Sequence, residues 1–273
     1  DYQKNEMARY GVSARTRGNT HLEVLQKLLH LTVPAAFEMS NLKELQLLSM
    51  PQKEWDSMQC SELDVCIPGF KSLTLLSFNL NILPFGVSWR SADLDKHSST
   101  RLREFLHRIR KELEDKDETA ADVIAVQELF ASPFVPGFCA QVYAVREMAA
   151  LGYHAVIGPK PSFLDLLVRG KWTDSGLVIF SRLPVVESRS IRFNSGAAMD
   201  AGACKGAIWA RLELVAGRFL DVFNCHLQAS HTGSEADIYE RIRRSQLTEL
   251  RDFVALSGSE HPYVLTGDFN VDA

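Results

Sequence analysis

The sequence has few cysteines, no long apolar run and no excess of positive charge. Its five cysteines include no Cys-x-x-Cys pair. A structural zinc site is therefore not expected, and reduced thiols in an intracellular protein fit best, with one surface disulfide left open. No apolar run approaches the roughly 18 residues of a membrane span. The 30 Lys and Arg stand against 34 Asp and Glu, so no nucleic-acid partner is expected, because such proteins usually carry a basic excess.

The two ends of the sequence also lack familiar signals. It begins with Asp1 rather than Met, and nothing resembles a signal peptide, so we expect a fragment of a longer protein. The 273 residues are 46% hydrophobic and 23% charged, which is the composition of an ordinary globular protein. We expect residues 1–72 to be an N-terminal extension, partly helical and of unknown role, and residues 73–273 to be the main domain.

From residue 73 on, short apolar runs alternate with amphipathic patterns. The runs predict strands at 73–80, 122–128, 153–158, 175–181, 184–193, 207–214, 219–227 and 263–267. The amphipathic patterns predict helices at 98–113, with a cap at Ser98 to Thr100, at 142–152 and at 237–256. This order of elements predicts a layered α/β domain with much antiparallel sheet in its middle.

Polar residues follow four of these strands, and active sites are commonly assembled from loops at the ends of rigid strands. The residues are Asn79, Glu128, His226 and the pair Asp268 and Asn270. Each alone has an ordinary explanation: a turn Asn, a Glu that caps a helix or carries a surface charge, a packed core His, and an Asx turn. All four explanations must hold together for the site to vanish, so the combined pattern favours a site.

Five segments resemble the endonuclease/exonuclease/phosphatase superfamily in their order and spacing. They are "SFNL", "VQE", "SGLVIFSRLPV", "CHLQA" and "TGDFN". The resemblance implies an α/β fold, a two-sheet sandwich flanked by helices (the deoxyribonuclease-like four-layer sandwich), with its C-terminal part missing. Within the superfamily the sequence looks most like the neutral sphingomyelinases. Two segments carry this closer match: a helix with Arg244, Gln246 and Leu247, and Asp200 placed five residues before Lys205.

The implied activity is that of a Mg²⁺-dependent phosphodiesterase that hydrolyses sphingomyelin or a related sphingolipid to ceramide and phosphocholine. Such hydrolysis requires neutralisation of charge on the phosphate and a stabilised leaving oxygen. The Glu128 carboxylate and the Asn79 amide oxygen suit Mg²⁺. His226, with Asn270 beside it, can donate to a non-bridging phosphate oxygen. Asp268 only accepts when ionised, so its expected role is to orient a His or a water.

Lys205 offers a positive charge to the phosphate, and Asp200 can hold that ammonium in or out of the site. Without the family resemblance, these two residues would be read as a solvated loop pair. The superfamily's Ser-Asp-His segment, whose His activates the attacking water, does not occur in the chain, and His231 is the nearest substitute. We therefore expect the 273-residue chain to be nearly inactive, because general base catalysis contributes about 10²–10⁴-fold.

The segment "KPSFLDLLVRGKWTDSGL", residues 160–177, shows few strand or helix signals of its own. Its apolar side chains beside Arg169 and Lys171 suit an interfacial enzyme, in which basic residues meet lipid phosphates. It also resembles the lipid-facing segment of neutral sphingomyelinases. The alternative is that these are core residues of a loop lid.

We expect the partner to be a phospholipid substrate at a membrane surface and the protein to be cytoplasmic and peripheral at the membrane, with secretion left open. Two other functions stay open. The chain could be a superfamily cousin that acts on inositol phosphates or nucleic acid, or a non-catalytic fragment that binds lipid or a partner. The sequence identifies no protein partner.

Overall fold

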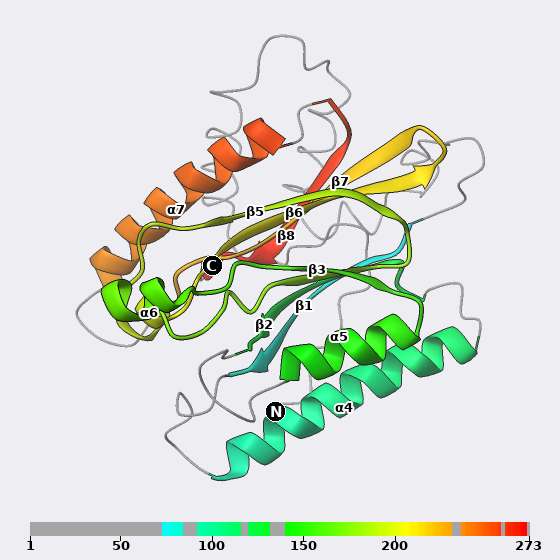
Figure 1. Ribbon diagram of the computed structural model, residues 1–273, viewed down its shortest axis with the longest axis horizontal. Helices are drawn as coiled ribbons and strands as arrows, with labels where there is room; N and C mark the ends of the chain where they lie inside the picture. The colour runs from blue at the N-terminus through cyan, green and yellow to red at the C-terminus, as the bar shows by residue number, and fades with distance from the viewer. Residues whose placement is uncertain are drawn as a thin grey trace, which may run out of the picture.

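The computed structural model describes residues 73–83, 92–115, 120–131, 140–230, 236–257 and 260–271, with helix side chains from residues 100 and 237 onward. The expectations for residues 1–72 and for His231 lie outside the described residues. Of the cysteines in the described ranges, Cys204 and Cys225 are buried and free. Two four-stranded sheets pack against each other, and helices cover their outer sides (Figure 1).

The first sheet has the strand order β1-β2-β4-β3. Its strands are β1 (Leu75–Ile82), β2 (Val123–Leu129), β3 (His154–Ile157) and β4 (Val178–Ser181). Strands β1 and β2 are parallel, whereas β4 runs antiparallel to both β2 and β3. All four strands fall where the apolar runs predict them.

The second sheet has the strand order β5-β6-β7-β8. Its strands are β5 (Val185–Arg192), β6 (Gly206–Val215), β7 (Arg218–His226) and β8 (Tyr263–Asp268). Strands β5, β6 and β7 form an antiparallel meander, and β8 joins β7 in parallel. The predicted antiparallel middle of the domain is thereby confirmed.

Three long helices complete the four layers. Helices α4 (Ala92–Glu114) and α5 (Ala140–Ala150) cover the first sheet, and α7 (Ala236–Ser257) covers the second (Figure 1). The apolar stripe of α4 packs into the core of the first sheet as its spacing predicts, through Leu102, Phe105, Leu106 and Ile109. The predicted two-sheet sandwich flanked by helices is confirmed. Among the described helices, none combines the length and apolarity needed to cross a bilayer.

The start of α4 differs from the prediction. The helix begins at Ala92, so Ser98 to Thr100 lie inside it and do not cap it. Upstream Ala92, Leu94 and Lys96 favour helix, and a Ser or Thr inside a helix costs only about half a kcal/mol relative to Ala. Ser and Thr residues indicate the start of a helix only where the residues before them do not themselves favour a helix.

The segment before β4 also differs from the prediction, because it contains helix α6 (Phe163–Arg169). Ser162 and Asp165 form a reciprocal capping box, in which the Asp165 N–H donates to Ser162 Oγ and the Ser162 N–H donates to Asp165 Oδ2. Gly170 closes the helix in the left-handed conformation, at φ 63°. Both signals were present in the sequence and were missed because the helix is short.

The interior between the sheets is largely apolar, and one buried amide pair crosses it. Strands β2 and β7 are buried on both faces, which explains their nearly continuous apolar sequences. Gln127 Nε2 donates to Asn224 Oδ1 across the sheet interface at 2.7 Å, and Asn224 Nδ2 donates to the carbonyl oxygens of Val126 and Val178 at 2.9 and 3.2 Å. The pair therefore fixes how the two sheets lie against each other.

A second buried polar group, Asp174, holds the end of β2. Its Oδ1 accepts from the N–H groups of Ala131 and Gly176, and its Oδ2 accepts from Gln141 Nε2 at 2.6 Å. Burial raises the pKa of Asp174 to about 6, against the three hydrogen bonds, which lower it. The carboxylate ties the start of α5 and the approach to β4 to the residues that follow β2.

The amide pair predicts a coupling that a double-mutant cycle can measure. Asn224→Leu removes the shortest hydrogen bond of the buried Gln127 amide, whose Nε2 keeps only its contacts of 3.2 and 3.3 Å to the Ala125 carbonyl and Ser77 Oγ. We therefore expect a loss of about 1–3 kcal/mol in the free energy of unfolding. The double variant with Gln127→Leu should lose less than the sum of the two single variants, because neither polar group is then stranded. Urea unfolding of the four proteins gives the coupling energy, and strict additivity would contradict the proposed link.

The raised pKa of Asp174 predicts a pH-dependent stability. The folded protein binds this proton more tightly than the unfolded chain, whose reference pKa is 3.8, so stability falls as pH rises from about 4 through 6. A shift of this size corresponds to about 3 kcal/mol. We expect the unfolding free energy of the wild type, relative to Asp174→Asn, to fall by that amount between pH 4 and pH 7. A difference that rises with pH would show that the hydrogen bonds outweigh burial.

Candidate functional site

The predicted polar residues meet at one end of the sandwich because the strands that carry them are parallel in pairs. Strand β1 runs parallel to β2, and β7 runs parallel to β8, where His226 lies opposite Asp268. Asn79 Nδ2 donates to Asp268 Oδ2 at 2.8 Å, so a residue of the first sheet contacts a residue of the second. The structure thus brings Asn79, Glu128, His226 and Asp268 together.

Unusual backbone conformations shape this end of the sandwich. Glu128 and Asn270 have φ values of 54° and 51°, in the left-handed region that costs non-glycine residues of order 1 kcal/mol or more and often occurs at functional sites. Gly267 has φ 144°, and a Cβ there would overlap the backbone of Cys225 on β7. Glycine is therefore required where β8 approaches β7, one residue before Asp268.

The Asp268 side chain forms an Asx turn and also faces the site, although the sequence suggested these two roles as alternatives. Its Oδ1 accepts from the Asn270 N–H at 2.9 Å, which is an Asx turn, while its Oδ2 faces Asn79 and His226. Asn270 Nδ2 in turn donates to the Leu227 carbonyl at 2.9 Å. The turn explains the local sequence, and the second oxygen remains available to the site.

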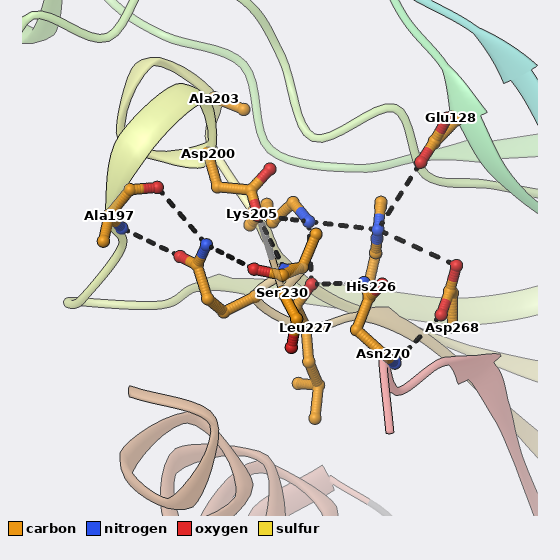
Figure 2. A network of polar contacts seen from close by, with 12 residues as sticks. Glu128, Ala197, Asp200, Ala203, Lys205, His226, Leu227, Ser230, Asp268 and Asn270 are labelled. Carbon is orange, nitrogen blue, oxygen red and sulfur yellow. Dashed lines mark hydrogen bonds and ion pairs between the residues drawn. The ribbon is translucent and has the colours of Figure 1, made fainter. Parts of the chain in front are cut away.

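His226 is buried between charges of opposite sign (Figure 2). Its Nε2 lies 3.0 Å from Lys205 Nζ, 3.8 Å from Glu128 Oε1 and 4.0 Å from Asp268 Oδ2. Burial, and then the charge of Lys205, lowers the pKa of His226 well below its ordinary value. With Lys205 protonated, Nε2 accepts and the ring proton sits on Nδ1, which has no hydrogen-bond partner among the described residues. The donor role predicted for His226 therefore requires the other tautomer.

Lys205 is buried, and its ammonium group has three acceptors for its three hydrogens. Nζ lies 2.9 Å from Asp200 Oδ2, 2.7 Å from the Leu227 carbonyl oxygen and 3.0 Å from His226 Nε2. Burial lowers the pKa of Lys205, and Asp200 opposes that shift. Asp200 also accepts from the Ala229 N–H at 2.8 Å. The alternative of a solvated loop pair is wrong, and in this arrangement Asp200 holds the ammonium among protein acceptors.

Glu128, His226 and Asp268 could hold a metal ion, because their ligating atoms all lie within 4.8 Å of one another. Burial raises the pKa of Glu128; Asn79 and Lys205 lower it, and the charges of Asp268 and Asp200 raise it again. A divalent cation would offset both the burial and the repulsion between carboxylates, and hard oxygen donors suit Mg²⁺ or Ca²⁺. The two carboxylates of this group therefore fit such an ion.

The predicted ligand Asn79 reaches this cluster but turns its amide oxygen away. Asn79 Oδ1 accepts from the Asn81 N–H at 2.9 Å, while Nδ2 faces the carboxylates. Ligation through oxygen would require the amide to rotate by half a turn. Asp268, assigned only an orienting role from the sequence, supplies the second carboxylate of the cluster.

A glutamine network positions the loops around Lys205. Gln246 Oε1 of α7 accepts from the Gln228 N–H and its Nε2 donates to the Ser195 carbonyl, both at 2.8 Å. Gln228 Oε1 accepts from the Ala197 N–H at 2.8 Å. Helix α7 thereby holds the short 3-10 helix η2 (Ala198–Gly202), which carries Asp200. Arg244, which belongs to the same sequence motif as Gln246, instead pairs with Glu240 on the exposed side of α7.

Sequence reasoning assigned no role to Gln127, Asn224 or Gln228. Gln127 and Asn224 are polar residues inside otherwise apolar strands, one residue before Glu128 and two before His226. That placement was the available signal, because a buried amide inside a strand needs a partner. Gln228 had no such signal, because its partners Ala197 and Gln246 lie far from it in the sequence.

The chain matches one family model and several curated proteins. The family model described as the Endonuclease/Exonuclease/phosphatase family matches residues 76–273. A sphingomyelinase of Dictyostelium discoideum is 27% identical over 184 residues, which is 55% of this chain and 37% of that protein. A sphingomyelinase C of Bacillus cereus is 32% identical over 101 residues, 36% of this chain and 30% of that protein. The matches thus span only 37% and 30% of the length of these two relatives.

Two solved structures share the fold. Sphingomyelinase C from Streptomyces griseocarneus has a TM-score of 0.54 and 22% identity, and the match covers 74% of this chain and 65% of that one. A beta toxin variant from Staphylococcus aureus with bound magnesium ions has a TM-score of 0.53 and 20% identity, with 74% and 66% covered. At these identities the likeness establishes the two-sheet fold and nothing finer.

The clustered carboxylates predict divalent-cation binding that depends on Glu128. Loss of a group that only orients a ligand costs about 10- to 100-fold in metal affinity, so Glu128→Gln should cost at least that much. Because the pKa of Glu128 is raised, protons should begin to compete with the cation at a higher pH than for an ordinary Glu. Calorimetric titration with Mg²⁺ or Mn²⁺ measures both effects. Glu147→Gln, which removes a carboxylate of helix α5 outside the cluster, is the control. Equal affinity of the two variants would exclude this site.

Proposed function

Because this chain belongs to the endonuclease/exonuclease/phosphatase family, we propose that it is a Mg²⁺-dependent phosphodiesterase that hydrolyses sphingomyelin or a related sphingolipid to ceramide and phosphocholine. The observation that carries the proposal is the convergence of Glu128, Asp268 and a neutral His226 with the ammonium of Lys205 at one end of the sandwich. The curated relatives named sphingomyelinase support the choice of lipid over other phosphodiesters. The proposed place of action is a membrane surface, in a protein that is cytoplasmic and peripheral.

The carboxylates of Glu128 and Asp268, with Asn79 after rotation of its amide, would hold the cation. A bound Mg²⁺ neutralises phosphate charge and polarises its oxygens. His226 faces the same point, and in its Nε2–H tautomer it would donate to a non-bridging oxygen. Asn270 keeps the Leu227 carbonyl, and hence the end of β7, in place beside His226.

The Lys205 ammonium could exchange one of its hydrogen-bond acceptors for a phosphate oxygen. It is held by Asp200, the Leu227 carbonyl and His226. A phosphate oxygen that replaces His226 as acceptor would free Nε2 to carry a proton. Arrival of the phosphate would thus switch the His226 tautomer to the one that donates. The Asp200 pair remains intact throughout, so the buried ammonium keeps one full counter-charge.

The substrate class is tested by comparing three reactions under one set of conditions. With Mg²⁺ present, we measure the release of phosphocholine from sphingomyelin micelles, the release of phosphate from inositol phosphates, and the nicking of plasmid DNA. We expect activity on sphingomyelin only, and Glu128→Ala should lower it by about 100-fold or more, as loss of a charge-stabilising group does. Glu147→Ala serves as the control. Activity confined to DNA or inositol phosphates would rule out the lipid assignment.

The same assay tests the missing general base. Because the chain contains no Ser-Asp-His segment, turnover by the 273-residue chain should lie about 10²–10⁴-fold below that of a chimera that adds this segment from a family member. His231→Ala in the unextended chain distinguishes the alternative. If the two chains turn over equally and His231→Ala abolishes the activity, His231 acts as the base and the prediction is wrong.

A further inference from the structure

Strand β1 contains a bulge at the end that faces the site. Two of its residues, Leu80 and Asn81, stand against the single residue Glu128 of β2, because the pairing of the two strands shifts there. Asn81 and Glu128 both have a left-handed backbone, at φ 50° and 54°. Bulges redirect neighbouring side chains and are common next to active sites. The bulge therefore decides how Asn79, just before it, and Glu128, opposite it, face the site.

Arg101 of helix α4 binds the backbone of this bulge. Its Nε donates to the Leu80 carbonyl at 2.8 Å, and its Nη2 donates more weakly to the Asn79 carbonyl at 3.4 Å. A bulge disrupts the hydrogen bonds between two strands locally, so its carbonyl groups need other donors. The guanidinium carries several N–H donors in a fixed fork, which lets one side chain hold two successive carbonyls. Arg101 thus fixes the backbone that carries the Asn79 side chain.

The Asn79 side chain connects the bulge to the carboxylates of the site. Its Oδ1 accepts from the Asn81 N–H inside the bulge, and its Nδ2 donates to Asp268 Oδ2 at 2.8 Å. Burial raises the pKa of Glu128, and a side-chain hydrogen bond with Asn79 lowers it. One amide thus contacts both carboxylates that are proposed to bind the cation, and the position of that amide depends on the bulge.

We propose that Arg101 is a positioning residue for the cation site: it holds the β1 bulge, and thereby the Asn79 amide, in the place where that amide keeps the two carboxylates together. Arg101 acts through Asn79 and lies 22 residues beyond it in the sequence. The inference rests on the proposed function, because it assumes that Glu128 and Asp268 bind a divalent cation. It adds a residue of α4 to a site otherwise built from strand ends and loops.

Charge and position predict opposite results when Arg101 is removed. A positive charge near the site repels a cation, so its loss would by electrostatics alone tighten the binding of Mg²⁺. Loss of positioning instead lets the carboxylates drift apart and weakens the binding. The sign of the change in cation affinity therefore separates a positioning role from a simple charge effect.

Calorimetric titration with Mg²⁺ or Mn²⁺, in the absence of substrate, measures this sign. We expect Arg101→Gln to weaken cation binding by about 10- to 100-fold, the loss typical of a group that orients a metal ligand. Arg101→Lys keeps the charge and one donor but lacks the fork, so it should recover part of the affinity. Arg108→Gln is the matched control, because it makes the same change on the same helix at a side chain that is 49% exposed and pairs with Glu112. Unchanged or tighter binding by Arg101→Gln would overturn the proposal.

The route through Asn79 is tested in a double-mutant cycle. In the Asn79→Ala background, Arg101→Gln should cause little further loss of cation affinity, because the side chain through which Arg101 acts is already gone. An equal loss in both backgrounds would overturn this route.

Amide hydrogen exchange in EDTA tests the bulge without any cation. The Asn81 N–H is bonded to Asn79 Oδ1, and we expect it to exchange about tenfold faster in Arg101→Gln, since a hydrogen bond to a charged group is lost next to it. Amides at the centre of β7 report global unfolding and should change less. Unchanged exchange at Asn81, or an equal change at Asn81 and in β7, would show that Arg101 does not hold the bulge.

The positioning role and the proposed function can fail separately. If Glu128→Gln weakens cation binding and Arg101→Gln does not, the cation site stands and the positioning role is overturned. If Arg101→Gln weakens cation binding but the wild type does not hydrolyse sphingomyelin, the positioning role stands and the lipid assignment fails. A wild type that binds no divalent cation would overturn both.

Discussion

The hydrogen bond between Gln127 and Asn224 is the contact on which the arrangement of the site depends. It joins two sheets that meet mostly through apolar side chains, which pack well in more than one relative position. A buried amide pair has far less freedom, because a shift of either strand leaves polar groups unpaired. Glu128 and His226 lie one and two residues beyond these amides, so the same bond sets their separation. Metal-binding and phosphate-binding groups are thus aligned by a structural contact.

Burial and charge together set the chemistry at this end of the sandwich. The neutral His226 lies between an ammonium and two carboxylates, and its low pKa follows from burial and from Lys205. The carboxylates repel one another, which favours binding of a cation between them. The Lys205 ammonium has an acceptor for each of its three hydrogens, so a phosphate must replace one of these acceptors. The arrangement is consistent with a site completed by metal and substrate.

The residues just after α6 and the proposed catalytic site share a short segment. Lys171 and Trp172 contact the backbone of Ala203 and Gly202, and Asp200 of the same segment pairs with Lys205. Gly202 lies so close to the Trp172 ring that a Cβ there would overlap it. The glutamine network from α7 supports this segment from the other side. A rigid segment of this kind keeps the end of α6 and the reacting groups in fixed relation.

The sequence by itself determined the strands, the long helices and the family, because apolar periodicity and short motifs are local properties of the chain. It also identified the residues at the strand ends. Only the tertiary structure decided their contacts: Asp268 beside Glu128, the amide of Asn79 turned toward carboxylates, and Lys205 buried among three acceptors. The exposure of the apolar side chains of α6 was decided in the same way. Distance, burial and pKa depend on residues far apart in the chain, and no local pattern contains them.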